Sequence, residues 1–235
     1  ISSIVTGSLQ NVNVANTVLN LQSRGLNSSF AAAYFPDVVI TDPATQTNVQ
    51  APPSVAVLGA FSLNDRIGFP WFAPAGFTRG ALSSVLETQV KLNQNNLDTL
   101  YSADVNPITV FPGSPSPVVF GQKTLLAAQS ALDRVNVRRL LIDVRRKVRE
   151  VSNRFIFEPN RATTLAAFQA AVTPILASIQ AQQGLDRFSV RIDTTTTTQA
   201  DVENNTIRGK IFLQPTRSVE FISLDFVVTN AGAQV

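Results

Sequence analysis

Apolar residues recur at helical spacing in two long stretches of the chain. In residues 133–153, "DRVNVRRLLIDVRRKVREVSN", the apolar positions are Val137, Leu140, Leu141, Val144, Val148 and Val151. In residues 162–183 they are Leu165, Phe168, Val172, Ile175, Leu176 and Ile179. Positions three, four or seven apart share one face of a helix, so each stretch predicts an amphipathic helix. Gly184 is a suitable C-cap for the second helix, whereas Pro174 should kink or break it because proline lacks a backbone N–H.

Alternating apolar and polar residues predict strands on both sides of these helices. The predicted strands are residues 11–18 ("NVNVANTV"), 37–41, 108–111, 118–120, 187–193 ("RFSVRID"), 206–215 ("TIRGKIFLQP") and 218–228 ("SVEFISLDFVV"). In the last strand, one face carries Ile222, Leu224, Phe226 and Val228. The other face mixes Phe221 and Val227 with Ser223 and Asp225.

The remaining segments predict connections and one domain boundary. "GFPWFAPAGFTRG" (68–80) is rich in Gly, Pro and aromatics, which predicts a rigid irregular loop. Its expected anchors are Phe69, Trp71, Phe72 and Phe77. Residues 81–106 should be helical in pieces, with Leu82, Val85, Leu86 and Val90 on one side, and "TTTTTQADVENN" (194–205) should be a solvated loop. We expect a boundary near residue 95, which divides the chain into residues 1–95 and 96–235.

The composition limits the catalytic and metal-binding chemistry that this chain can support. The 235 residues include no Cys and no His, which removes disulfides, thiolate zinc sites and the usual Ser-His-Asp and Cys-His catalytic sets. Charged residues make up 15%, below the usual ~25%. There is no Met and the sequence opens at Ile1, so we expect a fragment, a processed product or the ordered part of a longer polypeptide. No signal peptide is visible, and no apolar run approaches the ~20 residues of a membrane-spanning helix.

Two motifs resemble ligand sites but lack the required spacing. "FGQKTL" (120–125) contains Gly-x-Lys-Thr, whereas a phosphate loop needs Gly-x-x-x-x-Gly-Lys-[Ser/Thr]. It is more typical of a turn between a strand and a helix. Asp193, Asp201 and Glu203 do not have the spacing of a calcium loop. We therefore predict no catalytic, cofactor-binding or metal-binding residue.

The basic helix allows three interpretations. Arg138, Arg145 and Arg149 lie along one flank of its apolar stripe, while Asp143 and Glu150 lie among the other basic residues on its far side. A nucleic-acid reader usually adds exposed aromatics or a recognisable module, neither of which is visible, and a net charge of +3 is modest for this length. The remaining interpretations are a merely solvated face and a basic edge that docks on an acidic protein partner.

Beyond residue 27, the order of several segments resembles the tail sheath proteins of contractile bacteriophages, and of related contractile injection systems and R-type bacteriocins. The most specific segments are "APAG", "VNPI", "FGQKTL", "DRVNVRRL", "FEPN" and "RSVEFISLDFVV". The sequence departs from the family at Val55, where many members have Gly after "PPS", and at Asp193, which a Cys often precedes. Because it opens at Ile1, we also expect it to be without the N-terminal arm that family members exchange with a neighbour.

The resemblance implies a structural protein without catalysis or cofactors. Subunits would form hexameric rings stacked as a helix around a tail tube, and contraction would drive the tube through a target envelope. The implied partners are other copies, the tail tube protein, and baseplate and tail terminator proteins, with no nucleic acid or membrane. The implied location is the virion tail or an equivalent contractile particle, assembled in the bacterial host cytoplasm.

The resemblance also implies an α+β fold with two parts. Residues 96–235 would form the conserved inner C-terminal domain, a mixed sheet packed with the two long helices. Residues 1–95 would be part of an outer or middle α+β domain.

Terminal strands of the family pass between neighbouring subunits, and the last predicted strand suits this role. It is long and apolar on both faces, which makes it a poor free edge in a monomer. The residues we assign to inter-subunit linkage are Val219, Phe221, Ile222, Leu224, Phe226 and Val228. Arg138, Arg145 and Arg149 are candidates for contact with the tube or a neighbouring subunit. The alternatives are a carboxylate-based hydrolase with converging acids in a deep pocket, and a nucleic-acid-binding module with steeply salt-dependent binding.

Overall fold

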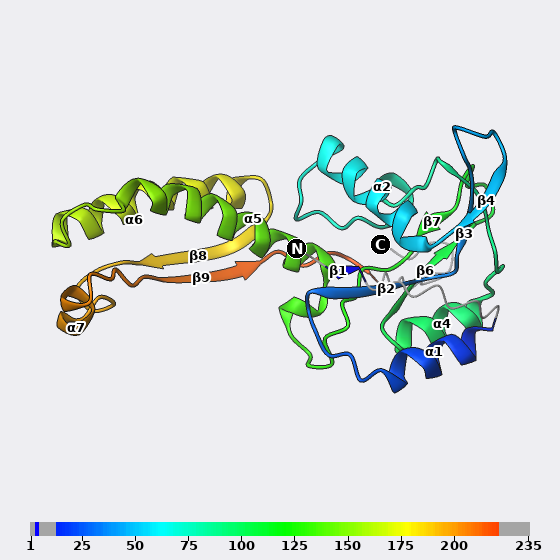
Figure 1. Ribbon diagram of the computed structural model, residues 1–235, viewed down its shortest axis with the longest axis horizontal. Coiled ribbons are helices and arrows are strands. Elements are labelled where there is room, and N and C mark those ends of the chain that lie inside the picture. Colours follow the sequence, from blue (N-terminus) through cyan, green and yellow to red (C-terminus); the bar gives the residue numbers. More distant parts are fainter. Residues whose placement is uncertain (1–2, 5–12, 221–235) are drawn as a thin grey trace, which may run out of the picture.

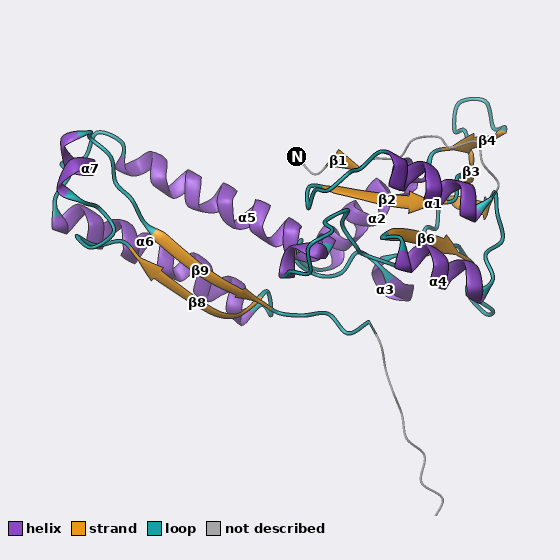
Figure 2. Ribbon diagram, turned by 90° about the horizontal axis from the view of Figure 1, so that it is seen from below, coloured by secondary structure: helices purple, strands orange, loops and turns teal. Residues whose placement is uncertain are grey.

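The computed structural model describes residues 3–4 and 13–220, which form a globular unit and a long arm (Figure 1). The globular unit comprises residues 3–4 and 13–130, and the arm comprises residues 131–215. Residues 216–220 run back from the arm to the globular unit, so the described chain leaves the globular unit and returns to it (Figure 2).

A four-stranded sheet forms the centre of the globular unit. Its strands are β1 (Ser3–Ile4), β2 (Ala31–Phe35), β6 (Val105–Thr109) and β7 (Val118–Val119), side by side in that order. β2 is parallel to β1 and β6, and β7 is antiparallel to β6. α1 (Val14–Ser23) and α4 (Gln94–Ser102) cover one face, and α2 (Pro53–Ile67) covers the other (Figure 1).

Both faces of this sheet are buried, because the side chains of β2 alternate between two cores. Ala32 and Tyr34 join the core beneath α2, together with Val57 and Ile108. Ala31, Ala33 and Phe35 join the core with α1 and α4, which includes Leu21 and Leu100. β2 and β6 therefore hold together segments on the two sides of residue 95. The domain boundary near that residue stays a prediction.

A second, antiparallel sheet extends the globular unit in the order β4-β3-β5, made of Asn48–Ala51, Val38–Thr41 and Val85–Thr88. The strand predicted at 37–41 is confirmed by β3. The helical prediction for residues 81–90 is wrong, because Val85 and Thr88 are buried and β5 pairs with β3. The loop at 68–80 is irregular as predicted, except for the single-turn helix α3 (Gly76–Arg79).

The arm contains the two predicted long helices and a two-stranded sheet. After a short 3-10 turn (Ala131–Asp133), α5 spans Val135–Ser152, and after a second one (Asn153–Phe155), α6 spans Ala162–Ala181. β8 (Leu185–Arg191) and β9 (Lys210–Pro215) pair antiparallel and confirm two predicted strands. α6 continues through Pro174 without a break.

Two predictions of local structure are wrong because a side-chain cap outweighs the sequence pattern. Residues 14–18 belong to α1 rather than to a strand, because the Asn13 side chain accepts a hydrogen bond from Ala15 N and Val14 and Leu21 are buried on one face. The solvated loop at 194–205 contains a helical turn, α7 (Gln199–Glu203), which begins at a capping box between Thr198 and Asp201.

Judged by length and composition alone, α6 is long and apolar enough to cross a membrane. The mean hydropathy of its most apolar stretch is 1.5, and 22% of that stretch is buried. No apolar run of this kind was predicted from the sequence. In the arm, the buried side of α6 packs against α5 and β8.

Candidate assembly interface

The two arm helices enclose one apolar core with the inner face of β8–β9. Its buried residues include Leu140 and Val144 of α5, and Val172, Leu176 and Ile179 of α6. Alternate residues of the strands complete it, namely Phe188, Val190, Ile211 and Leu213. The outer face of the same sheet carries exposed Arg187, Arg191, Lys210 and Phe212. The arm therefore presents a basic outer sheet face with an aromatic side chain in it.

Both edges of this sheet are open in the part of the chain that the structure describes. β8 pairs with β9 and with no other described strand, and the same holds for β9. A two-stranded sheet is only marginally stable alone, and an unpaired edge offers a row of N–H and C=O groups to an added strand. The outer edges of β8 and β9 are therefore without a strand partner among the described residues.

The arm joins the globular unit at Trp71, in the loop predicted to be rigid. The Trp71 ring stacks on Phe69 with centroids 4.8 Å apart, and its Nε1–H donates to the Gln182 carbonyl at 3.0 Å. Gly184 allows this approach, because a Cβ there would lie 2.7 Å from Ile179 and 3.0 Å from the indole. The joint therefore depends on a large aromatic residue that meets a residue without a side chain.

The predicted basic flank of α5 does not lie on one surface. Arg138 is 6% exposed; its guanidinium lies 3.9 Å from the Phe30 ring centroid, and Nη2 donates to Ser29. Burial, with a smaller contribution from the Arg145 charge, lowers the pKa of Arg138. Arg145 and Arg149 are exposed and form no ion pair with any described residue. Of the three arginines of the predicted flank, Arg145 and Arg149 are therefore the two exposed to a partner, and their contact role stays a prediction.

The other charges of α5 hold the helix in place. Arg139 donates to both oxygens of Asp65 at 2.6 and 2.7 Å and stacks on Phe61 of α2. Asp143, which the pattern placed on the far side of the helix, is buried and pairs with Arg146 at 2.8 Å and Lys147 at 2.7 Å. These contacts tie α5 to α2 and brace its solvent side.

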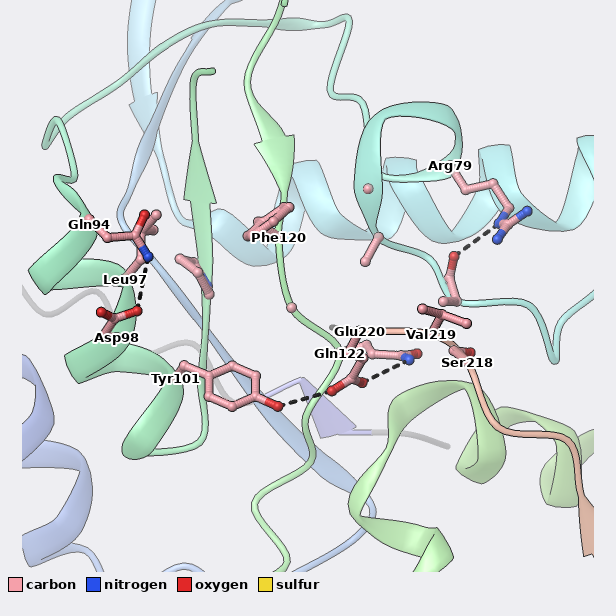
Figure 3. Close-up of a pocket in the computed structure, with 15 residues that line it drawn as sticks. Arg79, Gln94, Leu97, Asp98, Tyr101, Phe120, Gln122, Ser218, Val219 and Glu220 are labelled. Atoms are coloured by element: carbon pink, nitrogen blue, oxygen red, sulfur yellow. Dashed lines mark hydrogen bonds between the residues drawn. The ribbon is translucent and has the colours of Figure 1, made fainter. Parts of the chain in front are cut away.

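The predicted inter-subunit strand begins where the described chain ends. Ser218, Val219 and Glu220 are described and are not paired in a sheet, and Val219 is 78% exposed. Phe221, Ile222, Leu224, Phe226 and Val228 lie outside the described residues. The root of that segment is held by Glu220, and Figure 3 shows its contacts with Tyr101 and Gln122.

Glu220 joins segments that lie far apart in the sequence. Arg134, at the N-cap of α5, donates to the two Glu220 oxygens at 2.7 and 3.0 Å. Tyr101 of α4 donates to Glu220 at 3.0 Å, and Gln122 donates at 3.2 Å. Asn136 donates to the Ser218 hydroxyl at 3.2 Å. We call Tyr101, Gln122, Arg134 and Glu220 the Glu220 clasp.

The clasp changes the titration of its members. Burial raises the pKa of Glu220, but the hydrogen bonds and charge of Arg134, with the hydrogen bonds from Tyr101 and Gln122, outweigh it and hold the pKa below its ordinary value of 4.5. Burial and the bond to Glu220 raise the pKa of Tyr101. A carboxylate held in this way stays ionised at neutral pH and keeps its three partners together.

The "FGQKTL" segment supports this root as a structural turn. Lys123 Nζ donates to the Tyr101 carbonyl at 2.7 Å and pairs with Asp104 at 3.0 Å. Its backbone N–H donates to the buried Asn106 side chain at 2.6 Å. A Cβ at Gly121 would lie 2.8 Å from the same Asn106 oxygen, so glycine permits the close approach. The glycine and lysine therefore hold the "VNPI" strand rather than a phosphate.

A cavity of about 520 Å³ adjoins the clasp. Its lining combines apolar residues such as Leu97, Pro107 and Phe120 with Arg79 and Asp98, and with three of the clasp residues, Tyr101, Gln122 and Glu220. Asp193 and Asp201, considered above as cation ligands, instead cap the turns at the outer end of the arm. The described residues hold no group of three acidic or other ligating side chains suited to a metal ion.

No member of the clasp is among the site residues predicted from the sequence. Three of them nevertheless lie in segments that carry the family resemblance: Gln122 in "FGQKTL", Arg134 in "DRVNVRRL" and Glu220 in "RSVEFISLDFVV". Tyr101 lies shortly before "VNPI". Their position in or beside these segments was the signal in the sequence that could have pointed to the clasp. Spacing gave none, because Glu220 lies 86 to 119 positions from its partners.

Comparisons with known proteins agree with this architecture. The sheath complex of an extracellular contractile injection system, PVC, in the contracted state matches with a TM-score of 0.84 and 26% identity, covering 96% of this chain and 63% of that one. The helical sheath of the anti-feeding prophage, also contracted, matches with a TM-score of 0.75 and 25% identity over 86% of this chain and 56% of that one. The fold is that of contractile-sheath proteins.

Sequence matches are more specific. Residues 127–229 match the family model of the phage tail sheath C-terminal domain. The tail sheath protein of Enterobacteria phage T4 is 31% identical over 192 residues, which cover 82% of this chain and 29% of that protein. That of Vibrio phage KVP40 is 31% identical and covers 82% and 28%. The chain belongs to the phage tail sheath family and spans less than a third of the length of these relatives.

Proposed function

We propose that this chain is part of a structural subunit of a contractile tail sheath. Copies would polymerise as stacked hexameric rings around a tail tube, and contraction would drive the tube through a target envelope. The family membership and the match to two contracted sheaths support this function. They give no support to the hydrolase or nucleic-acid alternatives.

The observation that carries the proposal is the open two-stranded sheet of the arm. Helices cover its inner face, yet neither edge is paired within the described residues. A strand from another copy would extend the sheet through backbone hydrogen bonds, as in other strand-addition complexes. Such a link survives large movements of the units it joins, which a sheath that shortens requires.

The segment 218–228 has the sequence that this edge requires. Its apolar positions Ile222, Leu224, Phe226 and Val228 would continue the inner layer formed by Phe188, Val190, Ile211 and Leu213. On the opposite face, Asp225 would lie on the side that carries Arg187 and Arg191. Both the apolar pattern and the charges therefore favour a strand that adds with Ile222 on the helix-covered face of the sheet and Asp225 on its basic outer face.

Partners and location follow from the same proposal. Besides other copies, we propose contacts with the tail tube protein and with baseplate and tail terminator proteins, and no role in catalysis or in binding nucleic acid or membrane. Arg145 and Arg149 are the proposed contact to an acidic tube or neighbour. The protein would act in the virion tail or an equivalent particle, after assembly in the bacterial host cytoplasm. We keep residues 96–235 as the proposed inner domain and 1–95 as part of an outer or middle one.

The test compares the two faces of the segment in the full-length protein. Ile222→Asn with Leu224→Asn removes the apolar face, and Ser223→Asn, on the other face, is the control. Negative-stain microscopy should show tubes for the unmodified protein and the control, and folded unassembled subunits for the first variant. Tubes of normal length from the first variant would refute strand exchange by this segment.

A further inference from the structure

We propose that the outer end of the arm inserts Phe157 into the cavity beside the Glu220 clasp of another copy. This inference rests on the proposed self-assembly and adds a second contact, separate from strand exchange. The partner is a second copy of this chain, because one molecule carries both the exposed aromatic residue and the cavity that fits it.

Phe157 is the most exposed large apolar residue among those that the structure describes. It is 102% exposed, and the neighbouring Ile156 is 56% exposed. Both residues follow the 3-10 turn at the end of α5, in the connection to α6. In the same connection, the Asn160 side-chain amide donates to the carbonyl of Thr206, between α7 and β9, at 3.1 Å. The turn is therefore ordered while its two apolar side chains remain uncovered.

The backbone of Phe157 is unfavourable for its residue type. Its φ is +74°, in the left-handed region where Gly or Asn is preferred and a bulky side chain is a clear outlier. A strained and fully exposed Phe is hard to explain by the stability of one copy, because Asn would suit the turn and water better. Such outliers cluster at functional sites, and here the function is contact.

The cavity offers a matching apolar and aromatic surface. Its apolar lining includes Ala73, Leu97, Pro107, Phe120 and Val219. Phe120 continues into an aromatic row, with ring centroids 4.7 Å from Phe111, which in turn lies 5.3 Å from Phe77. Phe77 and Phe120 are 59% and 45% exposed, so this row is open to an incoming ring. Aromatic pairs at such spacings add to the gain from burial alone.

Size and charge both suit the outer end of the arm. The cavity of about 520 Å³ is large enough to receive one aromatic side chain with its neighbour Ile156. Arg79 lies in its lining and has no acidic partner among the described residues, while Glu158 follows Phe157 directly. Asp98, also in the lining, can face Arg154 or Arg161 of the same end.

The positions of the two surfaces determine what the contact builds. The α5–α6 connection lies at the outer end of the arm, and the elements around the cavity lie in the globular unit (Figures 1 and 2). A contact between different surfaces on the same chain is heterologous and produces rings or helices rather than closed dimers. Val219 lines the cavity, so the contact would also cover the root of the predicted exchange strand.

Cysteine cross-linking tests the contact in the full-length protein, with any cysteine outside these 235 residues replaced by serine. Glu158→Cys keeps Phe157 and pairs with Gln94→Cys in the cavity lining. The control pairs Glu158→Cys with Leu19→Cys, an exposed position on α1. Oxidation of assembled tubes should give a ladder of disulfide-linked copies for the first pair only.

A second variant separates contact from folding. Phe157→Asn suits the positive φ, so its melting temperature should not fall. The concentration needed for assembly should rise about tenfold or more, as expected for loss of a buried interface anchor. Leu19→Asn, at an exposed apolar position of α1, should leave assembly unchanged.

The outcomes distinguish this inference from the proposed function. Tubes without a cross-link in the Glu158–Gln94 pair, or normal assembly of Phe157→Asn, would overturn this inference alone. Cross-linking of Glu158→Cys to a tail tube protein carrying its own cysteine, and not to another copy, would also overturn it. Failure of the unmodified protein to form tubes would overturn the proposed function together with this inference.

Discussion

Glu220 is the side chain on which the root of the C-terminal segment depends. Glu220→Gln removes the charge that holds Arg134 while keeping the size of the side chain. Because the Glu220 side chain is 20% exposed and bonded to a cation, we expect a loss of about 1–2 kcal/mol in the free energy of unfolding. Urea denaturation measures it, with Glu87→Gln on β5 as an exposed control. An equal loss in both variants would show that the clasp does not stabilise the fold.

The same carboxylate predicts a pH dependence. Its pKa is held below the ordinary 4.5, so its stabilisation is fully present above that value and is lost as the pH falls through the lower folded-state pKa. The glutamine variant cannot titrate at this position. The stability difference between the two proteins should therefore be constant from pH 7 to about pH 5 and shrink below pH 4.5. Denaturation curves at each pH would contradict this if the difference grew with acidity.

At the scale of elements, the turn between α6 and β8 makes a close contact at Gly184. Gly184→Ala places a Cβ against Ile179 and Trp71, and such overpacking should cost about 1–3 kcal/mol. Gly59→Ala is the matched control, because α2 has open space there and alanine favours a helix interior by about 0.5–1 kcal/mol. Thermal unfolding should move in opposite directions for the two variants. A lower melting temperature for Gly59→Ala would contradict the control's reasoning.

How far the elements could be predicted depended on their length and on local caps. α5 and α6 were predictable because several turns of each keep one apolar stripe. α1 was mistaken for a strand because "NVNV" alternates between polar and apolar residues. Asn13 caps a helix only when the residues after it are helical, and the alternation does not show this. β5 was mistaken for a helix because its pairing with β3 joins residues more than 40 positions apart.

The candidate interface could be predicted only in part. The apolar alternation of 218–228 and the flank of α5 were visible in the sequence, but the burial of Arg138 was not, because Phe30 and Ser29 reach it from another element. Phe157 belongs to the quoted "FEPN" segment, yet its exposure and positive φ required the structure. Periodicity describes one element, whereas both features arise where two elements meet.

In the whole molecule, the arm separates the contacts that hold the chain together from those left for partners. Its inner sheet face and the Trp71 joint are covered, whereas its sheet edges, basic outer face and outer end are not. An isolated subunit gains nothing from the two sheet edges, because their backbone groups have no strand partner among the described residues. Neighbouring copies that cover these surfaces would supply the missing stability.

The two free cations of α5 provide the last prediction. Arg145→Glu with Arg149→Glu reverses charges that no described ion pair uses, so the free energy of unfolding should change by less than about 0.5 kcal/mol. Arg24→Glu with Arg66→Glu gives the same change in net charge on α1 and α2 and is the control. If the flank docks on an acidic tube or neighbour, the first pair should reduce tube binding or assembly about tenfold or more, and the control should not. Co-sedimentation of sheath with tube at two salt concentrations measures this, and equal assembly and tube binding by both pairs would leave α5 a solvated face.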